Sequence, residues 1–176
     1  MSWNGCYTYC YDPCYNYCNN YCYNPCYNPC YNACSNLNNS YCPPQPVTPT
    51  NIFRANLTGQ NEVPPNSSAA TGTLVGTLSA NEQRFDYALQ TTGLTNITVA
   101  HFHDGAAGVI GPIVKDIPIN PATGTATASW TTTDVTQPLT PALVQKLKQG
   151  LIYVNVHTTQ FPNGEIRDQV RKAACT

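Results

Sequence analysis

The sequence predicts an all-β fold, an antiparallel sandwich or barrel with one short helix, preceded by a non-globular cysteine-rich segment. After residue 51, eight short runs of alternating apolar and polar residues are separated by Gly, Pro and Asn, a pattern typical of antiparallel β-proteins. One stretch, at 141–149, has the composition and end signals of a helix instead. Before residue 50 the chain consists mainly of Cys, Tyr, Asn and Pro, and its single formal charge there is Asp12.

These differences divide the chain into four parts. They are a Cys-x3-Cys repeat segment (1–42), a proline-rich linker (43–51), the predicted β-sandwich (52–170) and a C-terminal tail (171–176). A stretch of roughly 120 residues is long enough to bury a single hydrophobic core. The prolines of the linker favour a stiff, extended conformation.

Cysteine occurs at every fourth residue from Cys6 to Cys34 of the repeat segment. Three prolines in it argue against a helix. In an extended chain, side chains alternate between two faces, so these cysteines share one face and the tyrosines among them the other. If each repeat is instead a turn built on Asn-Pro, neighbouring cysteines approach the separation that a disulfide needs. The candidate cross-linking residues are Cys6, Cys10, Cys14, Cys18, Cys22, Cys26, Cys30, Cys34, Cys42 and Cys175.

We interpret residues 1–42 as a segment for covalent self-assembly into a homopolymer, in which thiols pair between chains or between neighbouring repeats and tyrosines stack. Two alternatives stay open: thiolate clusters that bind a soft metal, and a low-complexity tail that oxidises adventitiously. The CxxxC spacing differs from the CxxC spacing of common zinc sites, and the segment has no His, which disfavours discrete zinc sites.

The cysteine content and the first residues of the chain bear on its location. Dense cysteine is typical of oxidising compartments, but MSWNGCYTYC has neither the basic region nor the apolar run of a conventional signal peptide. Either the chain stays reduced and binds metal, or it is made in a cytosol and oxidised after release of the structure to which it belongs. The second alternative favours an extracellular, cell-surface or spore-surface location, such as a spore coat, exosporium or appendage.

Charge and hydropathy argue against two classes of partner. The formal net charge is −1 and the eight basic residues are scattered, so nucleic acid binding is not expected. No apolar run approaches the roughly 20 residues that a membrane helix needs.

The alternating runs define the predicted elements of the folded part. Strands are expected at 52–58, 71–79, 84–91, 97–103, 112–118, 124–132, 151–158 and 164–170. The helix at 141–149 has Thr140 as a cap, Pro141 at its first position and Gly150 at its end. We expect it to cover one end of the sandwich and to lead into the strand of His157. The predicted core consists of Phe53, Leu57, Leu74, Leu78, Phe85, Tyr87, Leu89, Val99, Ile113, Trp130, Leu143, Leu147, Ile152, Val154 and Val156.

The chain has three histidines, and two of them, His101 and His103, form an HxH pair. Residues i and i+2 of a strand point to the same face, and His157 ends an apolar strand that we place beside the first. Since imidazole clusters suit copper, zinc or iron, we expect the rings to converge on one ion, copper or zinc, with Asp104 or Glu165 nearby. Alternatively, the rings only bond loop carbonyls and join strand ends.

Three stretches of the folded part, in this order along the chain, resemble the CHRD domain first named from chordin. They are LTGQNEVPPNSSAATGTLVGTL, AHFHDGAAGVIGPIV and LTPALVQKLKQGLIYVNVHTTQFPNGEIRDQV. The resemblance spans about residues 52–170. It implies a secreted or surface β-sandwich, and it implies the fold more than the function. The repeat segment resembles cysteine-rich bacterial spore-surface proteins in composition.

The HxH stretch, followed by Gly-Pro, also resembles copper/zinc superoxide dismutase, which implies a Greek-key sandwich. Dismutases have more metal-ligating histidines, one of which bridges two metals. With three histidines in all, this chain is not expected to hold a binuclear site or to act as an enzyme. Two hypotheses about function therefore stand. The chain is a structural subunit of a fibre, coat or exosporium that displays a CHRD domain, or it is a copper- or zinc-binding redox or metal-sequestering protein.

Overall fold

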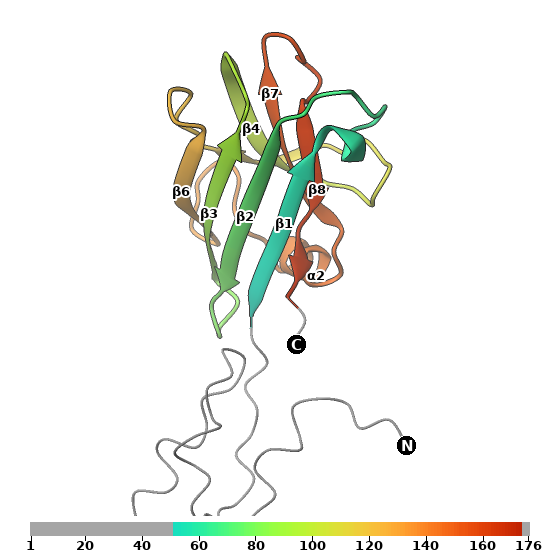
Figure 1. The fold of residues 1–176 in the computed structure, drawn as a ribbon. Helices are drawn as coiled ribbons and strands as arrows, with labels where there is room; N and C mark the ends of the chain where they lie inside the picture. The colour runs from blue at the N-terminus through green and yellow to red at the C-terminus, as the bar shows by residue number, and fades with distance from the viewer. Residues whose placement is uncertain (1–50, 174–176) are drawn as a thin grey trace, which may run out of the picture. The chain divides into compact units, whose positions relative to one another are not determined.

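The computed structural model describes residues 51–173, and this part of the chain forms nine strands, one α-helix and one short 3-10 helix (Figure 1). The strands are β1 (Ile52–Thr58), β2 (Thr71–Leu78), β3 (Arg84–Thr92), β4 (Ile97–Asp104), β5 (Ile113–Ile117), β6 (Thr125–Thr131), β7 (Ile152–Thr158), β8 (Ile166–Gln169) and β9 (Arg171–Lys172). The helices are η2 (Gly59–Asn61) and α2 (Pro141–Lys148). All eight predicted strands and the predicted helix are present, with ends that differ by at most two residues.

Every strand pairing among the described residues is antiparallel. The strand order is β5-β4-β7-β8-β1-β2-β3-β6, with β9 beside β1. Figure 1 shows β6, β3, β2 and β1 in one layer and β4, β7 and β8 in a layer behind it. Because β6 returns beside β3 and β7 returns beside β4, the connections follow the Greek-key pattern. The two end strands, β5 and β6, approach each other, so the sheet is nearly closed.

Aromatic side chains from four strands fill the space between the two layers. Phe102 stacks on Trp130, with ring centroids 5.6 Å apart, and contacts Tyr87 edge to face at 4.9 Å. Phe85 occupies the place where Gly76 has no side chain: a Cβ there would lie 2.2 Å from the Phe85 ring. Burying each such ring stabilises the fold by roughly 1.5–3 kcal/mol, so these contacts fix the register of β2 against β3.

The core prediction is wrong at two positions. Val99 and Ile113 are 44% and 48% exposed. A register shift between Ile97 and Val99, where β4 pairs with β7, interrupts the alternation and turns Val99 outward. Ile113 begins the edge strand β5, whose pairing with β4 is also shifted, opposite Phe102 and His103. The core-facing residues of this region are instead Ile97, Ala100, Phe102 and Ile117.

Helix α2 begins and ends as the sequence predicts. The Thr140 side chain accepts a hydrogen bond from the Leu143 backbone N–H, and Gly150 follows the helix with φ +72°. Its buried residues are Val144 and Leu147, whereas Leu143 is only partly buried against the core. The chain then enters β7, the strand of His157.

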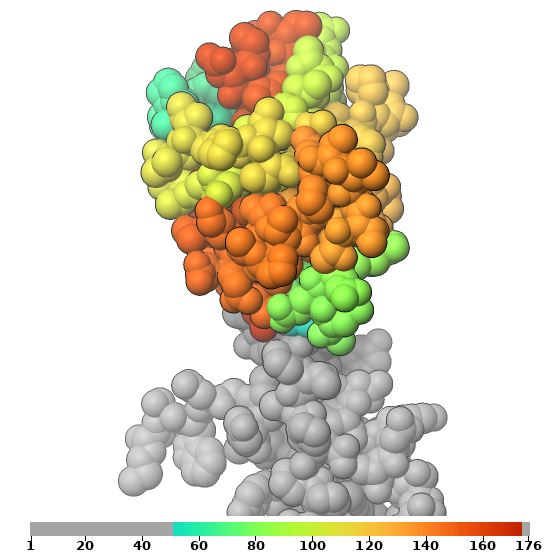
Figure 2. Space-filling view, turned by 180° about the vertical axis from the view of Figure 1, so that it is seen from behind, coloured from blue at the N-terminus to red at the C-terminus, as the bar shows by residue number. Residues whose placement is uncertain are grey.

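Strand β7 is buried on both faces. Ile152, Val154 and Val156 face the core, and the alternate residues face outward beneath loops that follow β4 and β7. Figure 2 shows this side of the molecule, where the yellow segment after β4 lies above the orange segment that carries α2. Polar side chains are thereby enclosed between the sheet and its loops. No helix in residues 51–173 is long and apolar enough to cross a membrane.

Candidate metal centre

The three histidines of the chain meet on the outer face of β4 and β7. His101 and His103 lie two residues apart on β4, and His157 lies on the neighbouring strand, opposite Val99. Each ring offers one nitrogen, and these three atoms lie within 4.8 Å of one another. The closest pair is His101 Nδ1 and His157 Nε2, 3.2 Å apart. The structure therefore brings these side chains together in the arrangement expected from the HxH spacing.

Backbone carbonyls fix the orientation of two of the rings. His103 Nδ1 lies 2.9 Å from the Gly111 carbonyl oxygen, and His157 Nδ1 lies 3.0 Å from that of Pro162. A carbonyl oxygen only accepts hydrogen bonds, so in both rings Nδ1 carries the proton and, in the neutral ring, Nε2 carries a lone pair. His103 Nε2 is buried and has no hydrogen-bond partner. An unpartnered buried acceptor costs about 1–3 kcal/mol, unless a ligand satisfies it.

Burial keeps the three rings neutral. Desolvation lowers the pKa of His101, His103 and His157 below the usual 6.5. The neighbouring imidazoles lower the pKa of His101 further, and the Gly111 hydrogen bond partly offsets the effect of burial on His103. Neutral imidazole is the form that binds metal ions, so these shifts favour coordination at neutral pH.

Further contacts hold the His103 ring from behind. Its plane stacks on the Tyr153 ring at 4.7 Å, with an angle of 6° between the planes, and the Arg167 guanidinium lies 3.5 Å from the Tyr153 ring centroid. On the other side of the cluster, Asp116 Oδ1 lies 3.9 Å from His101 Nε2. A carboxylate near the second nitrogen of an imidazole is the usual outer partner of a metal-bound histidine.

The two predicted carboxylates do not join the three-histidine group. Asp104 pairs with Lys146 of α2. Glu165 accepts hydrogen bonds from the hydroxyls of Ser68 and Thr158, both at 2.6 Å. The side-chain oxygen that does lie at the cluster belongs to Asn155, whose Oδ1 is 3.1 Å from His157 Nε2. The sequence analysis missed Asn155, although its position two residues before His157 puts it on the same strand face.

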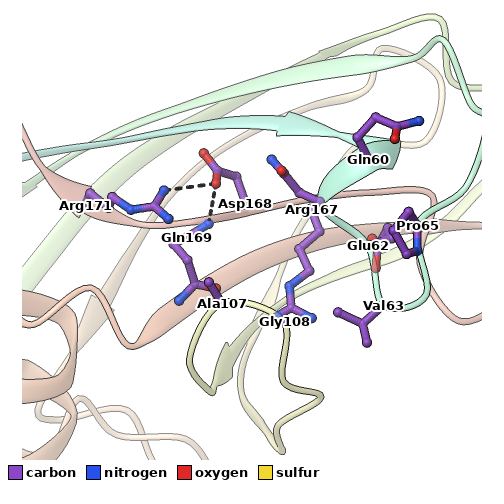
Figure 3. A pocket seen from close by; sticks show the side chains of 11 residues that line it. Gln60, Glu62, Val63, Pro65, Ala107, Gly108, Arg167, Asp168, Gln169 and Arg171 are labelled. Atoms are coloured by element: carbon purple, nitrogen blue, oxygen red, sulfur yellow. Dashed lines mark hydrogen bonds and ion pairs between the residues drawn. The ribbon is translucent and has the colours of Figure 1, made fainter.

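A pocket of about 370 Å³ lies between the η2 segment, the loop after β4, and β8 (Figure 3). Figure 3 shows Arg167 reaching from β8 toward Gly108, with Glu62 beside it. Burial raises the pKa of Glu62 to about 7, against the opposing effects of Arg167 and the Val63 backbone. Glu62 Oε1 has no hydrogen-bond partner. Glu62, Gly108 and Arg167 lie in the three stretches that resemble the CHRD domain, but the sequence analysis assigned them no role.

All ten predicted cross-linking cysteines lie outside the residues that the structure describes. Their pairing, and the assembly of chains through residues 1–42, therefore stay predictions.

Comparison with known proteins gives one match. A family model described as the CHRD domain matches residues 53–170, which is more than half of the chain. No curated protein and no solved structure matches it. The matched range contains β1 through β8 and all three histidines.

Proposed function

The chain belongs to the CHRD domain family, whose domains occur in extracellular proteins, and on this premise we propose that its sandwich binds one copper or zinc ion through His101, His103 and His157. The observation that carries the proposal is which ring nitrogens of the cluster carry protons and which carry lone pairs. Two rings direct their Nδ1–H groups at carbonyls, and the buried Nε2 of His103 has no partner. Such an arrangement leaves lone pairs directed into a shared space, as metal ligands require.

The spacing of the ring atoms also suits one ion. Two nitrogens bound to a tetrahedral zinc ion at about 2.0–2.1 Å are separated by roughly 3.3 Å. The His101 and His157 nitrogens are 3.2 Å apart. Imidazole is a ligand that both copper and zinc accept. We propose that the site holds the ion and does not turn over a substrate: Asp104 pairs with Lys146 and Glu165 accepts from two hydroxyls, so neither predicted carboxylate is placed as a general base at the cluster.

Calorimetric titration of the full-length chain with copper(II) and zinc(II) tests this site. The cysteines are first reduced and alkylated, because free thiols bind both ions. No cysteine lies in residues 51–173, so alkylation does not modify the folded domain. We expect one ion per chain, bound at least about tenfold more weakly by His157→Ala. Asp104→Asn is the matched control and should bind like the parent. Equal binding by the parent and His157→Ala would remove the metal site.

We also propose that residues 1–42 cross-link chains into an extracellular or spore-surface assembly that displays the CHRD domain. The unbroken four-residue spacing of eight cysteines supports this proposal, because disulfides persist in oxidising surroundings and thiols in strict register can pair repeatedly. Native material should migrate as high-mass species on a non-reducing gel and as single chains after reduction. A chain that lacks residues 1–42 should be monomeric. High-mass species formed without that segment would contradict the proposal.

A further inference from the structure

We infer that the side-chain oxygen of Asn155 supplies the fourth ligand of the bound ion, an inference that rests on the metal site proposed above. Asn155 lies on β7, directly opposite His101 in the strand register and two residues before His157. It is only 4% exposed, and its Oδ1 points at the histidines, 3.1 Å from His157 Nε2.

Neither Asn155 Oδ1 nor Nε2 of the neutral His157 ring carries a proton that could form a hydrogen bond between them. His157 Nδ1 carries the ring proton, because its partner is the Pro162 carbonyl oxygen, so the neutral ring presents a lone pair at Nε2. Asn155 Oδ1 is an acceptor too. His101 Nδ1 can give a proton to His157 Nε2, but that proton does not lie between His157 and the amide oxygen. Two acceptors held at 3.1 Å in a buried site repel each other, and a cation bound to both would remove that repulsion.

Rotating the amide by 180° does not remove the problem. Asn155 Nδ2 and Glu62 Oε1 both flank Gly164, where a Cβ would lie 2.8 Å from the first and 2.5 Å from the second. Rotation would turn the Asn155 oxygen toward the carboxylate oxygen of Glu62, which already lacks a donor. The unpartnered Glu62 oxygen therefore favours the NH2 group on its own side and the amide oxygen toward the histidines. Gly164, at φ +125°, leaves the space that this arrangement needs.

Distances match a set of three nitrogens and one oxygen around one ion. Neighbouring ligands of a tetrahedral ion are separated by roughly 3.3 Å. His157 Nε2 lies 3.2 Å from His101 Nδ1 and 3.1 Å from Asn155 Oδ1. With Asn155 bound, a four-coordinate ion has no position left for water or substrate. A closed ligand set is the property of sites that hold a metal rather than use it for catalysis.

Copper(II) titration at pH 7.5 of alkylated full-length variants tests the inference. Asn155→Ala should bind copper at least about tenfold more weakly than the parent. Asn155→Asp keeps an oxygen at the same position and adds charge, so it should bind at least as tightly and shift the visible absorption band of the bound copper. Asn66→Ala is the matched control. Its amide bonds the carbonyls of Gly164 and Glu165 without facing the cluster, so this variant should bind like the parent.

The possible failures are distinguishable. If the parent binds copper and His157→Ala does not, but Asn155→Ala binds as the parent does, only the role of Asn155 is overturned. A spectrum of Asn155→Asp that superimposes on the parent spectrum overturns it too, and decides the matter if Asn155→Ala fails to fold. A parent that binds no copper overturns this inference together with the metal site.

Discussion

Buried polar side chains on the outer face of β7 and β8 are stabilised by specific partners. The Arg167 guanidinium stacks on Tyr153 and donates to the carbonyls of Ala106 and Val109. Burying a charge without such bonds is strongly unfavourable. Glu62, directly after η2, differs from Arg167, because its Oε1 has no partner although the residue is only 6% exposed. Glu62 should therefore have a measurable effect on the free energy of unfolding.

Glu62 should make the free energy of unfolding fall as pH rises from about 4.5 to about 7. Its pKa in the folded state is raised from 4.5 to about 7, mainly by burial. Between these values the folded state keeps the proton and the unfolded chain has lost it, so stability decreases with pH and levels off above the window. At roughly 1.4 kcal/mol per pKa unit, the loss is at most about 3.5 kcal/mol.

Urea unfolding of metal-free parent and Glu62→Gln between pH 4.5 and 8 measures this effect. The difference in stability between the two should change across the window, with the parent losing stability relative to the variant. Stability curves that run parallel over the whole range would show that Glu62 does not titrate differently in the folded state.

At the scale of single residues, the sequence was enough to identify the three histidines as a cluster, but not the side chains that contact them. The histidines are three in number and two are spaced i and i+2, so a strand brings them to one face. Asp104 and Glu165 were favoured for closeness in sequence, but Asp104 meets Lys146 and Glu165 meets hydroxyls through tertiary contacts. Asparagine is frequent in this chain, so nothing in the sequence distinguishes Asn155.

At the scale of the strands, alternation predicts burial wherever the pairing is regular. Strand β2 alternates without interruption, and β3 does so along most of its length. The errors at Val99 and Ile113 come from register shifts on both sides of β4, which depend on the partner strands and leave no local signal. Strand β9 has two residues, too few for any alternation to be seen.

Leu89→Ala in β3 should lower the free energy of unfolding by about 2–5 kcal/mol. Leu89 is 2% exposed and lies between Leu74 of β2 and Ala126 of β6, so truncation leaves a cavity that its neighbours cannot fill. Val99→Ala is the control, because its exposed side chain loses little, within about 0.5 kcal/mol. Equal midpoints of urea unfolding for these two variants would contradict the burial of β3.

At the scale of the whole chain, two kinds of chemistry occupy separate parts of the sequence. All ten cysteines lie outside residues 51–173, and all three histidines lie within that range. Alkylation therefore blocks the thiols without modifying the folded domain, and the two proposed functions can be tested independently.

X-ray absorption at the copper edge, on the alkylated full-length chain loaded with copper, tests the central claim most directly. The measurement counts the imidazoles bound to the ion, whatever the affinity. The account predicts one copper per chain with three imidazoles in its coordination shell, and the loss of one imidazole in His157→Ala. Fewer than three imidazoles in the parent, or a spectrum that His157→Ala leaves unchanged, would contradict it.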